Sequence, residues 1–321
     1  MSAHDSTHSP RPSALGPTRS SILHITNGDS TRLSLEQSEV PGTFQPWRDV
    51  LHDGPVPTRL PLPEFRRIRS AFIASGGFSD AATIERGYQQ EDEAVASWDS
   101  RDETVLWFEH DLYDQLLLIR LLSMLPPDAG RKVSLVNPGT YLGMLPSSAF
   151  PALFANRRPL TPDQIALGSR AWDAYGDQTP LPLLDLLDAD TSALPFLDGA
   201  LRRLFQDYPD EHGLSRTERQ ILSVLEDGPM PWQKLFKACN AMEERMFMGD
   251  WTFRGVLADL GRGPSPLVED PVSLTGTGRD VLAGRADRIA LNGIDRWLGG
   301  VHLTPKRPWR RPPGSARPAS S

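Results

Sequence analysis

The chain has 321 residues, which is enough for two domains of ordinary size, each with its own core. Hydrophobic residues make up 39% and charged residues 23%, a composition typical of soluble globular proteins. The formal net charge of −7 argues against a general nucleic-acid binder or an anionic-membrane binder, because both functions need a positive field.

The single cysteine and the apolar runs indicate a soluble, cytoplasmic protein without a membrane partner. Cys239 cannot form an internal disulfide, so nothing in the sequence requires an oxidising compartment. Residues 1–20 lack the apolar region of a signal peptide, and we expect them to form a disordered leader. No apolar run approaches the roughly 20 residues that a membrane helix needs.

Residues 21–145 alternate between strand and helix patterns. Strands are predicted at 21–26, 43–47, 104–108 and 132–136. Helices are predicted from near Ser30, over 63–98 with a break at 75–77, and over 112–125. The last of these helices is apolar on nearly every face and should be buried. Strands separated by helices favour a parallel sheet with right-handed crossovers, so we expect a Rossmann-like α/β domain.

Residues 146–212 have a helical pattern punctuated by prolines, and we expect a helical connector packed on the sheet domain. A helix should begin at Thr161, which provides a cap and is followed by a proline and an acidic residue.

Residues 213–303 predict a winged-helix-like α+β unit. Ser215 and Glu218 form a capping-box pattern. Helices are predicted at 217–225, 231–246 and 250–260, followed by two short strands around Asp270. Helix, helix, helix and hairpin is the winged-helix order. Beyond this hairpin, Gly299 and Gly300 predict a strand that folds back closely on another element. Residues 304–321 are rich in proline and arginine, and we expect a disordered basic tail.

Three of the predicted strands end in dense polar clusters. These clusters are Asn27–Ser30, Arg48–Pro55 and Glu109–Gln115. In open α/β folds, ligands bind outside the carboxyl ends of parallel strands, where the loops converge. The three clusters therefore predict one site, with Asp29, Asp49 and Glu109 in a single crevice.

The first cluster contains the substrate-binding candidates Asn27, Gly28, Asp29 and Ser30. Gly28 permits tight backbone geometry, and Ser30 can cap the helix or present its hydroxyl beside exposed amides as an anion site. The Gly-Asp-Ser triplet resembles the serine-esterase family named for it, in which this serine is a nucleophile. That family also carries an Asp-x-x-His pair near its C-terminus, which this chain lacks, so both roles of Ser30 stay open.

The second cluster contains Arg48, Asp49, His52 and Gly54. Gly54 and the proline after it define a turn, which leaves the acid and the imidazole free to face a crevice. We assign Asp49 to acid–base work and the other three to substrate binding. The alternative is a turn in which Asp49 accepts hydrogen bonds from loop amides.

The third cluster contains the catalytic candidates Glu109 and His110, together with Asp111, Asp114 and Gln115 as substrate-binding candidates. Asp111 can cap the following helix. Carboxylates beside a histidine can act as general acid and base, or can hold a divalent metal ion. Their position directly after an aromatic strand should desolvate them, and mutual repulsion should raise at least one carboxylate pKa. The chain has no G-x-G-x-x-G pattern, so no dinucleotide cofactor is expected.

DNA binding by the C-terminal unit is disfavoured. Residues 213–305 contain eleven Lys and Arg against twelve Asp and Glu. The third helix, 250–260, contains one arginine and two aspartates, and phosphate contacts supply much of the affinity for DNA. We expect this unit to have a structural or partner-docking role.

The ordered motifs resemble a bacterial family of uncharacterised proteins. The motifs are His24–Ser30, Trp47–Pro55, Trp107–Gln115 and Gly213–Glu218. The family is catalogued as domain of unknown function eighteen-thirty-five, with a C-terminal partner catalogued as thirty-six-fifty-eight. The resemblance covers about residues 22 to 303. It implies that Asp29, Ser30, Asp49, Gly54 and Pro55 are the more general site residues, and it implies no activity.

Two functions follow from these patterns. The first is an enzyme, a hydrolase or transferase, that binds a small polar or phosphorylated metabolite at the strand ends. The second is a non-enzymatic regulator, in which the sheet domain senses a ligand and the winged-helix unit binds DNA or a protein. The sequence leaves the substrate, the metal and the oligomeric state open.

Overall fold

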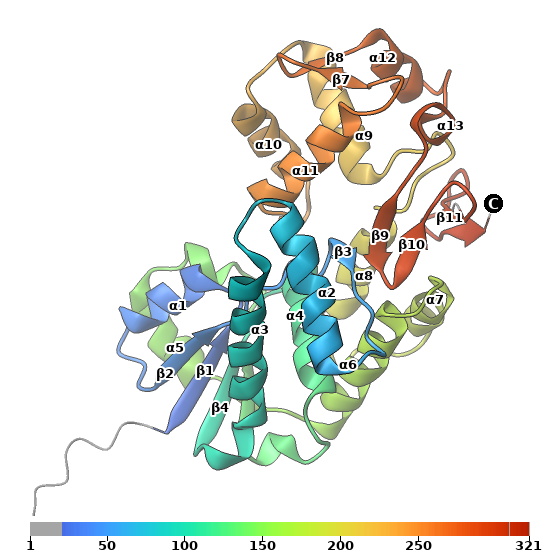
Figure 1. Cartoon of the computed structure of the whole chain (residues 1–321). Coiled ribbons are helices and arrows are strands. Elements are labelled where there is room, and N and C mark those ends of the chain that lie inside the picture. Colours follow the sequence, from blue (N-terminus) through green and yellow to red (C-terminus); the bar gives the residue numbers. More distant parts are fainter. Residues whose placement is uncertain (1–20, 308, 321) are drawn as a thin grey trace, which may run out of the picture.

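The computed structural model describes residues 21–307 and 309–320, so the expected leader 1–20 lies outside the described residues. The α/β class is confirmed (Figure 1). The first half of the chain contains β1 (Ile22–Thr26), α1 (Asp29–Glu36), β2 (Thr43–Pro46), β3 (Gly54–Pro55), α2 (Leu62–Ser75), α3 (Ala81–Ala96), β4 (Glu103–Trp107), α4 (Leu112–Ser123), β5 (Val133–Val136), α5 (Phe150–Ala155) and β6 (Arg158–Pro159).

The second half is mainly helical, with short strands near its end. It contains α6 (Pro162–Tyr175), α7 (Leu181–Asp188), α8 (Leu197–Phe205), α9 (Arg216–Val224), α10 (Trp232–Asn240), α11 (Asp250–Leu260), β7 (Val268–Glu269), β8 (Ser273–Leu274), α12 (Gly276–Leu282), α13 (Arg288–Asn292), β9 (Arg296–Gly299), β10 (Val301–Leu303), β11 (Trp309–Arg310) and β12 (Ala319–Ser320).

The main sheet has the strand order β2-β1-β4-β5-β6. The first four strands in this order are parallel, as expected, and β6 adds an antiparallel edge. The chain moves from β1 outward to β2 and then crosses back to β4 on the other side of β1. The order therefore reverses between β1 and β4, and in open α/β sheets ligands bind in the crevice at such a switch point.

Both faces of the sheet are covered (Figure 1). Side chains alternate along β4, as the period of a strand requires. Val105 and Trp107 pack in one buried cluster with Leu35 of α1 and Phe150 of α5. Leu106 and residues of α4 and α6 form the larger core on the opposite face. The helices that follow β1 and β4 thus lie on opposite sides of the sheet, and the switch point lies between their starts.

The helical connector packs on the sheet domain. α4 is buried on nearly all sides because α6 and α8 cover the faces that the sheet leaves free. Buried residues of α6, α7 and α8 belong to the same core as the inner strands. Thr161 caps α6 with the expected capping box.

The unit formed by α9 to α12 has a separate core, with Leu214, Ile221, Phe253 and Val281 among its buried residues. The capping box of Ser215 and Glu218 is present at the start of α9, and β7 pairs antiparallel with β8. The second helix of this unit was expected to reach residue 246, but α10 ends at Asn240. Residues 241–249, which we name the crossing segment, leave the helix and run to the sheet domain, where they contact His110 and His52.

The chain returns to the sheet domain through β9. This strand pairs parallel with β3 and antiparallel with β10. The prediction of a close approach at the double glycine is confirmed: a Cβ on Gly299 or Gly300 would lie 2.3 Å or 2.1 Å from the backbone oxygens of Tyr175 and Gly176. Gly299 also has a φ of +65°, which favours glycine.

The prediction of a disordered C-terminal tail is wrong for the residues that the structure describes. β11 and β12 form a hairpin. Arg310 forms an ion pair with Asp287, and Arg317 forms one with Asp188. These two arginines of the expected solvated tail instead pair with carboxylates on the folded body. Within the described residues, no helix is both long enough and apolar enough to cross a membrane.

Candidate functional site

The first and third polar clusters meet at the switch point of the sheet. Asn27 follows β1 and Glu109 follows β4. The amide Nδ2 of Asn27 donates hydrogen bonds of 3.0 Å both to Oε1 of Glu109 and to Oδ2 of Asp114. The neutral side chain of Asn27 therefore connects the ends of β1 and β4 with the first turn of α4 through hydrogen bonds.

The start of α4 adds two more carboxylates. Asp111 caps the helix as expected, because its Oδ1 accepts a hydrogen bond of 3.1 Å from the backbone amide of Asp114. Oδ1 of Asp114 accepts one of 2.9 Å from the backbone amide of Glu109. Glu109, Asp111 and Asp114 are all buried, and each offers an oxygen within 4.8 Å of the others. We name these three residues the carboxylate triad.

Burial destabilises the charged form of every member of the triad. It raises the pKa of Glu109 above its ordinary value, although hydrogen bonds from Asn27 and two backbone amides oppose the shift. Burial, with repulsion from Glu109, raises the pKa of Asp111 to about 7. Burial also raises the pKa of Asp114, and both other carboxylates raise it further. The expectation of raised carboxylate pKa values is confirmed, with burial as the largest cause.

The triad lacks a cationic partner among the described residues, since no arginine, lysine or histidine forms an ion pair with it. Its hydrogen-bond donors are the Asn27 amide and backbone N–H groups. Two amide oxygens at its edge, Oδ1 of Asn27 and Oε1 of Gln115, are buried without a hydrogen-bond partner. The Gln115 side chain is fully buried and donates to the backbone carbonyl of Glu109. Carboxylate and amide oxygens are the ligands that hard divalent cations prefer.

The loop after β5 closes one side of the triad. The backbone amide of Leu142 donates to Oε1 of Glu109. The His110 ring packs on Tyr141 with centroids 4.8 Å apart, and on Phe196 with centroids 5.9 Å apart. Burial lowers the pKa of His110, and Arg245 lowers it further. A neutral imidazole is therefore favoured at neutral pH, and its buried Nδ1 has no hydrogen-bond partner.

The residues after β1 lie at the same edge of the sheet as the triad. Gly28 has a φ of +128° and is the first residue before α1, so a side chain there would strain the backbone. Ser30 does not cap α1, because the helix already begins at Asp29. Its Oγ lies against the loop after β5, 2.8 Å from the position that a Cβ on Gly143 would take. Asp29 forms an exposed ion pair of 2.6 Å with Arg48, which links the ends of β1 and β2.

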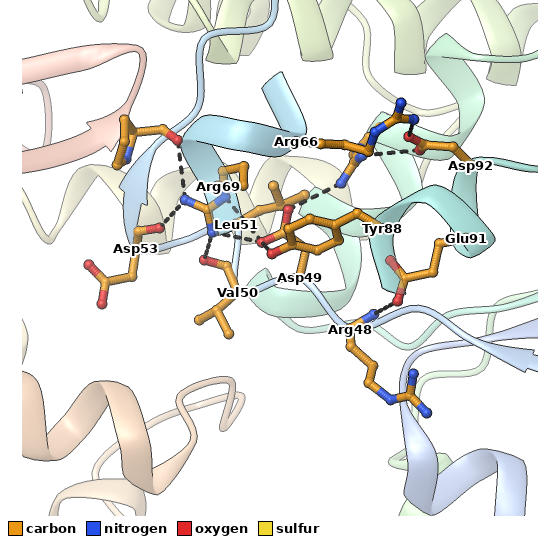
Figure 2. Close-up of polar contacts among 12 residues, drawn as sticks. Arg48, Asp49, Val50, Leu51, Asp53, Arg66, Arg69, Tyr88, Glu91 and Asp92 are labelled. Atoms are coloured by element: carbon orange, nitrogen blue, oxygen red, sulfur yellow. Dashed lines mark hydrogen bonds and ion pairs between the residues drawn. The ribbon is translucent and has the colours of Figure 1, made fainter. Parts of the chain in front are cut away.

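The single-crevice prediction fails for Asp49, because this residue is fully buried, with Arg69 of α2 and Tyr88 of α3 beside its carboxylate (Figure 2). Its carboxylate accepts hydrogen bonds of 3.1 Å and 2.7 Å from Arg69, 3.0 Å from the Tyr88 hydroxyl and 3.1 Å from Arg120. A carboxylate held between two buried guanidinium groups has no free position for a substrate proton. The geometry therefore gives Asp49 a structural role rather than the acid–base role expected from the sequence.

His52 and Gly54 also lie in packed surroundings rather than in the crevice. The His52 ring packs edge-on against Phe247 of the crossing segment and against Tyr113. Burial lowers the pKa of His52 to about 4. Gly54 lies in β3, where a Cβ would come within 2.4 Å of the Phe72 ring. His52 and Gly54 of the second cluster thus contribute to the packing around the buried ion pairs of Asp49.

Four residues of the site were missed by sequence reasoning. Tyr141, Leu142 and Gly143 follow β5, and the Asn-Pro-Gly sequence at the end of that strand was the available signal. Arg245 donates a hydrogen bond of 2.9 Å to the backbone carbonyl of His110 from far along the chain. The sequence around Arg245 did not indicate a role in the site, because Arg245 follows two glutamates in a stretch predicted to be helical.

Comparison of the chain with protein-family models and with curated proteins finds no match to either. The function proposed below therefore depends on the residues of the site alone. The resemblance to the families of unknown function stays a prediction.

Proposed function

We propose that the protein is a divalent-cation-dependent enzyme that catalyses hydrolysis or group transfer on a small polar or phosphorylated metabolite. The reacting group would bind in the crevice between β1 and β4. Glu109, Asp111 and Asp114 would hold the cation. Asn27, Gly28, Ser30 and the loop after β5 would surround the substrate.

One observation carries this proposal: three buried carboxylates converge, and no cationic side chain of the described residues forms an ion pair with them. Keeping such groups charged and unpaired is costly, so they require a proton or a cation. Asn27 and Gln115, which donate to the triad carboxylates and to the backbone of Glu109, each keep a buried amide oxygen without a hydrogen-bond partner. Structural ion pairs elsewhere in the protein, such as Asp49 with Arg69, are instead fully compensated.

The residues of the site divide the chemical work. A bound divalent cation supplies Lewis-acid polarisation of a substrate oxygen and lowers the pKa of a coordinated water. The Asn27 amide fixes the orientation of Glu109 and Asp114 relative to each other. His110 has an unpartnered Nδ1 and a lowered pKa, so it is suited to accept a proton from a nucleophile and return it to a leaving group.

The start of α1 supplies an anion-binding contribution. The first amides of a helix are unpaired and attract negative charge. Gly28 lets the backbone turn tightly there, and Ser30 places its hydroxyl near Gly143. We assign Ser30 to substrate contact rather than to nucleophilic attack, because no hydrogen bond joins its Oγ to a histidine among the described residues.

A ligand-sensing regulator is the second candidate, and the crossing segment favours it. The α9–α12 unit has the helix and hairpin order of a winged helix. Arg245 and Phe247 join this unit to the loop of His110 and to His52, so occupancy of the site could shift the unit. Its near-neutral charge and the single arginine of α11 favour a protein contact over DNA.

Calorimetric titration of Mn²⁺ into the full-length protein tests the proposal. We expect one site in the wild type and at least a ten-fold loss of affinity in Asp114→Asn. Asp163→Asn is the matched control, because Asp163 also lies in the first turn of a helix but is exposed. Wild-type Mn²⁺ affinity in Asp114→Asn, or equal losses in both variants, would contradict a cation site at the triad.

A further inference from the structure

We propose that Arg245 of the crossing segment binds the phosphoryl group of the substrate in a pocket beside His110. This inference rests on the proposed function, because it names the substrate group that the triad and the C-terminal unit would share. It assigns to the α9–α12 unit a direct part in the site.

The pocket has a volume of about 280 Å³ and lies between α8, the start of α4 and the crossing segment. Its lining includes His110, Leu112, Gly199, Arg202, Arg216 and Arg245. His110 and Leu112 flank Asp111 in the chain, so the pocket is lined by the two chain neighbours of one triad residue. Its size suits a phosphoryl group with a small attached moiety.

The arginines that line the pocket differ in their partners. Arg202 pairs with Asp198 at 2.7 Å, Arg203 with Glu243 at 2.8 Å and Arg216 with Glu244 at 2.9 Å. Arg245 forms no ion pair with any described residue. Its positive charge is therefore the one in this pocket that protein carboxylates do not neutralise.

Arg245 is held in place by contacts that leave most of its donors free. Its Nη1 donates to the backbone carbonyl of His110, and its guanidinium lies over the Phe196 ring at 5.2 Å from the centroid. Neither partner is negatively charged. A half-buried, oriented guanidinium with unused N–H groups matches the fork geometry that binds phosphate and carboxylate oxygens.

Tyr141 packs on the His110 ring, with centroids 4.8 Å apart, and lies within electrostatic range of both the triad and Arg245. Burial raises the pKa of Tyr141, and the charges of Asp111 and Glu109 raise it further, whereas the Met246 backbone and Arg245 lower it. These effects place both kinds of charge close to one hydroxyl. A phosphoryl group on Arg245 would therefore lie within electrostatic range of the triad.

The triad repels an anion in this position unless a cation neutralises it. Binding of phosphate and of a divalent cation should therefore be mutually favourable, and thermodynamic linkage requires the two enhancements to be equal. A carboxylate-bearing ligand would use the same fork, but a phosphoryl group offers more oxygens to bridge Arg245 and the cation.

Calorimetric titration of inorganic phosphate into the full-length protein, with and without Mg²⁺, tests this inference. We expect Mg²⁺ to strengthen phosphate binding at least five-fold in the wild type. Arg245→Gln should weaken phosphate binding at least ten-fold while keeping the wild-type melting temperature. Arg254→Gln is the control, since Arg254 also lies on an aromatic ring, Trp232, without an ion pair and should leave binding unchanged. Arg245→Lys keeps the positive charge but lacks the paired N–H donors of a guanidinium, so it should weaken phosphate binding by an intermediate factor. This variant replaces Arg245→Gln in the test if Arg245→Gln does not fold.

The outcomes separate this inference from the proposed function. Wild-type phosphate binding in Arg245→Gln, equal losses in both glutamine variants, or no phosphate binding by the wild type would overturn the Arg245 site. Phosphate binding that requires Arg245 but ignores Mg²⁺ would support the Arg245 site and contradict the cation site. If Mn²⁺ binding requires Asp114 but phosphate binding does not require Arg245, the proposed function stands and the Arg245 phosphate site is contradicted.

Discussion

The Nη1 of Arg245 donates a hydrogen bond of 2.9 Å to the backbone carbonyl of His110, although 135 positions separate the two residues in the chain. This contact brings the α9–α12 unit to the carboxyl edge of the sheet. Phe247, two residues on, is buried against His52. The C-terminal unit is thus anchored at the site by a segment that follows a shortened helix.

Substitution of the site residues should separate function from folding. We predict that Glu109→Gln and His110→Asn stay folded, because Gln keeps the shape of Glu109 and removes a buried acid, and Asn keeps a polar group near the position of the His110 Nδ1. Both should lose the thermal stabilisation that Mg²⁺ with phosphate gives the wild type, since ligands that bind the native state raise its apparent stability. Melting temperatures with and without ligand are the measurement. Aggregation of either variant, with ligand binding per folded molecule unchanged, would make the cluster structural.

Loss of the Asp49 charge should destabilise the fold. Asp49→Asn leaves Arg69 and Arg120 without their shared carboxylate in a buried position. Removal of one partner from a buried ion pair typically costs about 3–5 kcal/mol, and we expect a loss of that size in the free energy of unfolding. Urea denaturation measures it. Asp99→Asn is the control, because its ion pair with Arg131 is exposed and should contribute less than about 1 kcal/mol. Stability losses of similar size in both variants would contradict the structural role of Asp49.

His52 should make stability depend on pH. Burial lowers the pKa of His52 from 6.5 to about 4, so the folded state binds the proton less well than the unfolded state. Its contribution is therefore complete above about pH 6.5 and is lost as the pH falls toward 4, a change of about 3 kcal/mol. We expect His52→Phe, which keeps the packing on Phe247, to lose less stability than the wild type over this range. Denaturation curves from pH 7 to pH 4.5 measure the difference. Identical pH profiles for the two proteins would show that His52 is not the titrating group.

The contact between β9 and α6 should be intolerant of a side chain. A Cβ on Gly300 would lie 2.1 Å from the backbone oxygen of Gly176, and a backbone atom cannot move aside as a side chain can. We predict that Gly300→Ala lowers the free energy of unfolding by about 2 kcal/mol or more. Gly87→Ala in α3 is the matched control, because nothing lies within 4 Å of the new Cβ and alanine favours helix by about 1 kcal/mol. A harmless Gly300→Ala would show that this turn can move away from α6.

The sequence predicted β1, β2, β4 and β5 and the helices between them, because these elements have clear periodicity. It did not predict β3 or β6, which have two residues each, and β6 lies in the segment expected to be a helical connector. The caps at Asp111, Thr161 and Ser215 were also predictable, since capping depends on residues within one turn. Residues 27–30 and 109–115 were placed at one edge because parallel strands carry their following loops to the same side.

The remaining features depend on contacts that are distant in sequence. Asp49 is buried because it pairs with Arg69 and Arg120, which belong to two different helices. Nothing in the sequence around residue 49 indicated these partners. The pairing of β9 with β3 joins residues about 240 positions apart. Arg245 lies in a stretch whose composition favours helix, and only the packing of two units shows where its side chain points.

Anomalous diffraction from crystals grown with Mn²⁺ tests the central claim most directly. The account predicts one strong anomalous peak at the carboxyl end of β4, within bonding distance of oxygens from Glu109, Asp111 and Asp114. The peak should be absent from crystals of Asp114→Asn grown in the same solution. Full-occupancy Mn²⁺ elsewhere in the wild type, with the triad lacking anomalous density, would contradict a cation centre at the switch point of this sheet.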